Sequence, residues 1–69
     1  MKDQIYKIIE LTGTSVTSIE DAVASALKLA HKTVRNLRWF QVTETRGSIE
    51  KGKIHVWQVT IKVGFALDA

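Results

Sequence analysis

The segment SVTSIEDAVASALKLAHKTVRN, residues 15–36, predicts the one helix of this chain and organises everything on either side of it. Its apolar residues recur at the i, i+3, i+4 and i+7 spacing of an amphipathic helix: Ile19, Ala22, Val23, Ala26, Leu27, Ala30 and Val34. Alanines are prominent on this stripe, and their small side chains would let the helix sit close to a sheet. A single apolar stripe indicates a helix that covers one surface of a core.

The ends of this helix carry recognisable signals. Thr17 or Ser18 is expected to cap the N-terminus, and an acid three residues later, Glu20 or Asp21, would complete a capping box. The last turn is predicted to hold cations that favour the helix dipole, Lys32 and Arg35.

Strands are predicted on both sides of the helix. Gln4 to Leu11 is rich in β-branched and aromatic residues and is expected to end at Thr12-Gly13-Thr14. Two longer strands, Arg38 to Ile49 and Lys53 to Leu67, follow the helix and are joined through Glu50-Lys51-Gly52. The order β-α-β-β with short connections predicts an α+β fold, with a three-stranded antiparallel sheet of order 1-3-2. We expect one domain over residues 1–69, with the helix on one face of the sheet.

Alternation within the two long strands divides their side chains between two faces. The last strand presents its apolar set to the helix: Trp57, Val59, Ile61, Val63, Phe65 and Leu67. In the preceding strand Phe40 and Val42 match this helix-covered face. The opposite set is expected on the face without a helix, called the open face below: Trp39, Gln41, Thr43 and Thr45. Gly47 is expected to mark a bulge, so facing is not assigned beyond it.

Length and composition predict an oligomer. A chain of 69 residues buries a modest core, and domains this small usually need an added staple. The sequence has no cysteine, which excludes disulfides and thiolate metal sites. His31 and His55 lack ligand-like spacing, so no metal site is expected. Association of subunits is therefore the expected source of extra stability.

Other function classes find little support. No apolar run is long enough for a membrane span, and the N-terminus does not resemble a signal peptide, so a cytoplasmic protein without membrane contact is expected. No serine has a neighbouring His/Asp arrangement, and Gly13 to Ser15 lacks the other glycine and the lysine of a phosphate-binding loop. An enzyme is not expected. The net charge of +3 is compatible with an anionic partner but also with an ordinary mixed surface.

Trp39 is the residue whose predicted position most needs an explanation. An uncovered indole leaves a large apolar area in water. It could pack in a subunit interface, stack on a flat ligand such as a flavin or a nucleobase, or belong to the core if the register is misjudged. Gln58 falls on the same open face. Its carboxamide places a donor beside an acceptor and could pair with the edge of a pyrimidine-like ring, or it could simply face solvent.

The sequence resembles the dodecins, small flavin-binding proteins, over nearly its whole length. The resemblance rests on four pieces and on the spacing between them: LTGTS at 11–15, SIEDAVASAL at 18–27, RWFQVTETRG at 38–47 and VWQVTIKVGFALD at 56–68. It implies a β-α-β-β fold whose sheet wraps around the helix, assembled into a hollow spherical dodecamer.

The resemblance also implies a ligand. Dodecins bind flavin mononucleotide (FMN), riboflavin or related flavins without turnover, in storage or photoprotection. By this resemblance Trp39 would sandwich the isoalloxazine ring, and Gln58 would form hydrogen bonds with the pyrimidine edge of the ring. Arg46 would contact the phosphate. Some bacterial members also bind coenzyme A. Many carry a second basic residue after the Gly-Phe of the last strand, but here Ala66 stands in that place.

Two other function classes are also compatible with the sequence. One is a basic module that binds nucleic acid or a phosphorylated metabolite by stacking on the sheet. The single exposed aromatic residue and the small net charge argue against nucleic acid. The other is an assembly module without a ligand.

Overall fold

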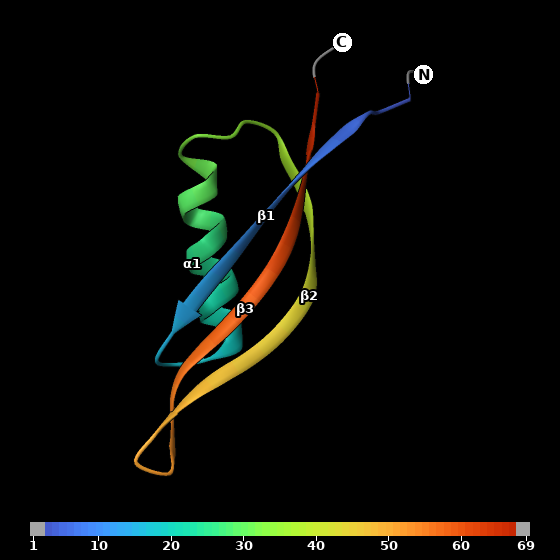
Figure 1. Cartoon of the computed structure of the whole chain (residues 1–69). Helices are drawn as coiled ribbons and strands as arrows, with labels where there is room; N and C mark the ends of the chain where they lie inside the picture. Colours follow the sequence, from blue (N-terminus) through green and yellow to red (C-terminus); the bar gives the residue numbers. More distant parts are fainter. Residues whose placement is uncertain (1–2, 68–69) are drawn as a thin grey trace.

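The computed structural model describes residues 3–67. Figure 1 shows strand β1 (Tyr6–Ser15), helix α1 (Ile19–His31) and the hairpin of β2 (Leu37–Glu50) and β3 (Lys53–Ala66). Strand β3 lies in the middle and is antiparallel to both neighbours, so the strand order is β1-β3-β2. The predicted β-α-β-β fold with an antiparallel sheet of order 1-3-2 is confirmed. No helix within residues 3–67 is long and apolar enough to span a membrane.

Strand β1 is longer than predicted, because Gly13 does not end it. The strand continues through Gly13 to Ser15 and pairs with β3 along its whole length. A Cβ at position 13 would overlap the backbone oxygen of Ala22 and would lie 3.0 Å from the Cβ of Ala26. The glycine therefore allows the helix to lie directly on the strand, which is a packing role rather than a turn.

The start of α1 is capped largely as predicted. Ser18 is the N-cap, and its Oγ accepts a hydrogen bond from the Asp21 N–H at 3.0 Å. The carboxylate of Asp21 instead accepts from the Ser15 hydroxyl at 2.7 Å. Because the Ser15 Oγ also accepts from the N–H groups of Thr17 and Ser18, it ties the end of β1 to the start of the helix.

The predicted last turn was wrong. The helix ends at His31, so the basic residues of its last turn are Lys28 and His31, and Lys32 is the cap. The N–H groups of Thr33 and Val34 both bond the Ala30 oxygen at 3.1 and 2.9 Å, which tightens the chain into a turn. Arg35 lies beyond that turn.

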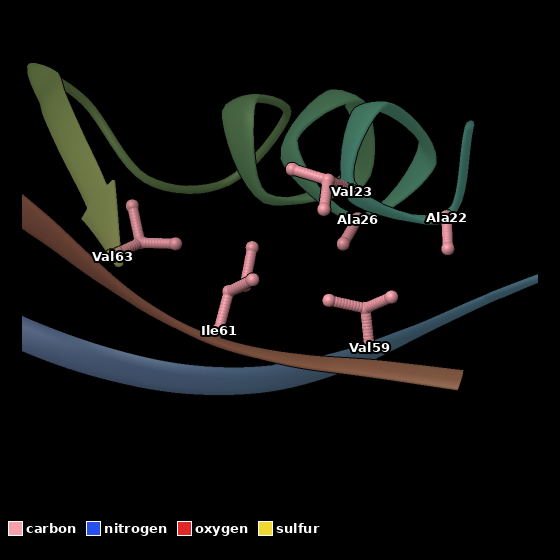
Figure 2. Close-up of a cluster of buried hydrophobic side chains, with 6 residues drawn as sticks. All are labelled: Ala22, Val23, Ala26, Val59, Ile61 and Val63. Carbon is pink, nitrogen blue, oxygen red and sulfur yellow. The ribbon is translucent and has the colours of Figure 1, made fainter. Parts of the chain in front are cut away.

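The core lies between α1 and the middle strand. Figure 2 shows side chains of the helix pointing toward those of β3, and the cluster is Ala22, Val23, Ala26, Val59, Ile61 and Val63. Isoleucine and valine fill the sheet side, while alanines on the helix side keep the two layers close. This is the arrangement that the alanine-rich stripe predicts.

Phe40 and Val42 lie on the helix side of the sheet, as predicted, but they are not core. They pair across the strands with Val63 and Ile61, which fixes their side. However, α1 packs mainly on β1 and β3, and β2 extends beyond it. Phe40 is therefore 48% exposed and Val42 42% exposed. Leu67, also assigned to the covered face, is likewise exposed.

A bulge in β2 changes the predicted facing of its second half. The register shifts between Val42 and Glu44, so Thr43 is the extra residue, and further shifts occur near both ends of β2 but not at Gly47. Beyond the bulge Thr45 pairs with buried Val59 on the helix side, so its assignment to the open face was wrong. The same shift brings Arg46 onto the open face, opposite Gln58.

The far end of the β2–β3 hairpin projects past the rest of the molecule, as Figure 1 shows. Strand β1 pairs with β3 only as far as Trp57, and the hairpin closes at Lys51-Gly52, both of which have positive φ. Its paired isoleucines are strongly exposed, Ile49 at 78% and Ile54 at 64%. Such apolar surface is expected where subunits meet.

Candidate functional site

Trp39 lies on the open face, over Gly64 of β3. The two residues pair across the strands, and a Cβ at Gly64 would lie 2.7 Å from the indole Nε1 and closer still to Cε2 and Cζ2. The indole therefore occupies the volume that any other residue at position 64 would fill. Trp39 is exposed on the face away from the core cluster, so the possibility that it is a core residue is excluded.

Tyr6 supports the indole from the side. The two rings meet edge to face, with centroids 6.1 Å apart and an interplanar angle of 68°, which is a favourable aromatic geometry. Ile8 also pairs with Gly64 and extends the apolar surface on the same face. Tyr6, Ile8 and Trp39 thus form one apolar patch, and 39% of Trp39 is still accessible.

Tyr6 and Gly64 were missed by sequence reasoning. Gly64 is the only glycine of β3 and stands at an open-face position, and a glycine inside a strand is a signal for close approach of another group. The role of Tyr6 depends on strand register, which the sequence did not supply.

Gln58 and Arg46 lie together in a separate polar cluster on the open face. The Arg46 Nε donates to the Gln58 Oε1 at 2.8 Å. The Nη1 of the same guanidinium donates to the carboxylate of Glu44, forming an ion pair. The carboxamide oxygen of Gln58 already accepts a hydrogen bond from Arg46. Its amide N–H donors have no partner among residues 3–67 and are available to a ligand. This cluster can bind a carbonyl or an anionic oxygen.

The two parts of the candidate site are far apart within one chain. Trp39 is opposite Gly64, whereas Arg46 is opposite Gln58, six residues away along β3. At about 3.3 Å per residue this is a separation of about 20 Å along the strand. One chain therefore cannot bring its indole and its Gln58 carboxamide to the same ring. A site that uses both residues must take them from two subunits.

Histidines and carboxylates do not form a metal centre among residues 3–67, where no group of three or more potential ligands lies together. His55 instead faces Glu50 near the hairpin tip, with Nε2 and Oε2 3.5 Å apart. His31 borders a cleft of about 420 Å³ between α1 and β2, beside Lys28, Arg38 and the exposed ring of Phe40. The cleft is open because α1 leaves β2 uncovered.

Comparison with known proteins gives a consistent family. The Dodecin family model matches residues 5–68. Dodecin of Thermus thermophilus is 45% identical over 65 residues, which are 94% of each chain. Calcium dodecin of Mycobacterium tuberculosis is 30% identical over 63 residues, 91% of this chain and 89% of the relative. The dodecin structure from Streptomyces coelicolor has a TM-score of 0.93 at 42% identity, covering 100% of this chain and 99% of that one.

Proposed function

The chain belongs to the dodecin family of small binding proteins, and from this premise we propose that it stores a flavin, FMN or riboflavin, without turning it over. The family relatives point to a homo-oligomeric assembly, and a dodecamer is the proposed form. Storage and photoprotection follow from the same proposal, because a stacked indole can quench an excited flavin by electron transfer.

The observation that carries this proposal is the placement of Trp39. Its indole rests on Gly64 and against Tyr6, and the remaining accessible surface faces away from the core. A planar isoalloxazine ring stacked there would cover apolar surface that is otherwise left in water. The indole is held in position before the ligand arrives, so binding has less side-chain entropy to remove.

Each proposed site is built from more than one subunit. Trp39 of one protomer would stack on the ring, while Gln58 of another would donate its amide N–H to a ring carbonyl oxygen. The separation of the two residues within one chain supports this arrangement, as does the exposed apolar patch around Trp39. On this proposal the ligand is bound only in the assembled protein.

Arg46 is proposed to meet the phosphate of FMN. Ala66, which stands where many relatives have a second basic residue, is buried opposite Tyr6 on β1. It provides no charge, so phosphate binding would depend on Arg46 more heavily than in a site with two cations. Riboflavin lacks the phosphate, so the missing cation at position 66 would reduce its affinity less than that of FMN.

An absorption and fluorescence experiment tests the function. Freshly purified protein, or apoprotein titrated with FMN, should show flavin absorption bands with strongly quenched flavin fluorescence. Protein that stays colourless, and that leaves the fluorescence of added FMN and riboflavin unchanged, would contradict the proposal.

A further inference from the structure

We propose that Glu44 sets the selectivity of this site between phosphorylated and unphosphorylated flavins by competing with the ligand phosphate for Arg46. The inference rests on the proposed flavin function and adds a residue to it. It is based on the two contacts of the Arg46 guanidinium on the open face, one with Gln58 and one with Glu44.

Arg46 is held from two directions. Its Nε donates to the Gln58 carboxamide oxygen at 2.8 Å, and its Nη1 is bound by the Glu44 carboxylate. The bulge at Thr43 is what makes this possible, because it places Glu44 opposite Thr60 and Arg46 opposite Gln58, both on the open face. Alternate residues of a strand lie on one face, so Glu44 and Arg46 are immediate neighbours.

The charges around this guanidinium are nearly balanced without a ligand. Glu44 offsets the charge of Arg46, and the open-face neighbours on β1 and β3 in the same two rows are uncharged: Thr12, Thr14, Gln58 and Thr60. A phosphate monoester carries about −1.5 to −2 charges at pH 7. To bind Arg46 it must displace the Glu44 carboxylate or share the guanidinium with it.

Riboflavin has no phosphate, so it does not compete with Glu44 for Arg46. Glu44 therefore lowers the affinity for FMN while leaving the affinity for riboflavin alone. The ion pair is about half exposed, with side chains 53% and 57% accessible, so the effect is moderate and is screened by salt.

The test compares the dissociation constants of FMN and riboflavin for the assembled protein and for Glu44→Gln. The amide keeps the size of the side chain and removes its charge. We expect the FMN affinity to rise roughly two- to tenfold at low ionic strength, with riboflavin unchanged. The gain should shrink as salt is added.

Two further variants make the result specific. Glu10→Gln removes the same charge from the same face, but Glu10 lies on β1 opposite Lys62, away from Arg46, and this variant should leave both affinities as they are. In an Arg46→Gln background, Glu44→Gln should no longer raise the FMN affinity, because the guanidinium for which Glu44 and the phosphate compete is absent.

The outcomes separate this inference from the proposed function. A Glu44→Gln protein whose preference for FMN over riboflavin is unchanged or reduced would overturn the role of Glu44, although flavin binding itself would stand. So would a gain that persists in the Arg46→Gln background. Failure of the parent protein to bind either flavin would overturn the proposed function and this inference with it.

Discussion

The indole of Trp39 lies directly over the backbone of Gly64, in the volume that a side chain at position 64 would occupy. The contact joins the edge strand β2 to the middle strand β3 on the open face of the sheet. It explains how so large an aromatic residue is kept in one place on a surface that the helix does not cover.

Gly64→Ala should therefore disturb the candidate site more than the fold. The added methyl group would overlap Cε2 and Cζ2 of the indole, and overpacking of this kind costs about 1–3 kcal/mol when the neighbour cannot move. Here the indole can be pushed outward, so we expect weaker flavin binding and an altered tryptophan emission spectrum, measured by fluorescence titration.

Gly47→Ala is the matched control for that change. It lies in β2, where a Cβ would be 3.3 Å from the Val56 oxygen and 3.8 Å from Trp57 Cε3, so it has more room. It should bind flavin like the parent. Equal loss of binding in both variants would show that strand glycines matter here only for stability.

Tyr6 is predicted to support Trp39 through ring packing rather than through its hydroxyl group. Tyr6→Leu should reduce flavin affinity by an amount that corresponds to the loss of one aromatic pair, about 0.5–1.5 kcal/mol. Tyr6→Phe keeps the ring and should bind almost as the parent does. A Tyr6→Phe protein as weak as Tyr6→Leu would show that the hydroxyl group, not the edge-to-face contact, is what matters.

Complementation between subunits tests whether the site is shared. Chains with Trp39→Ala keep Gln58, and chains with Gln58→Ala keep Trp39, so each type alone should bind flavin poorly. Assembled together, they should regain part of the binding, because a site that takes Trp39 from one chain and Gln58 from another is sometimes intact. The measurement is flavin quenching by oligomers formed from co-expressed chains.

The contrary result of that experiment is equally clear. If both residues acted from the same chain, every site in the mixed oligomer would lack one of them. Mixed oligomers that bind no better than either variant alone would therefore contradict the two-subunit site.

The element order was predictable from the sequence because its signals are local. The apolar stripe from Ile19 onward and the alternation of β3 each depend on one segment, and the structure confirms both. Gly13 was misleading because a glycine in a strand signals either a turn or a close approach. Only the position of Ala22 on the helix distinguishes the two.

The face of Arg46 could not be predicted because it depends on pairing between strands. Strict alternation from Phe40 would have put Arg46 on the helix side, away from Trp39. The extra residue at Thr43, whose hydroxyl donates to the Thr60 oxygen at 3.2 Å, reverses that assignment. The exposure of Phe40 was hidden for a similar reason, since periodicity gives the side of a sheet but not the reach of the helix that covers it.

The proposed function depends above all on stacking of Trp39 on a bound flavin, and titration of Trp39→Ala with FMN measures that contribution. The control is Trp57→Phe, which changes the other tryptophan, on the helix side opposite Ser15. We predict that Trp39→Ala loses most of the FMN binding and quenching, while Trp57→Phe keeps both. A Trp39→Ala protein that binds and quenches FMN as the parent does would show that the indole does not stack on the flavin.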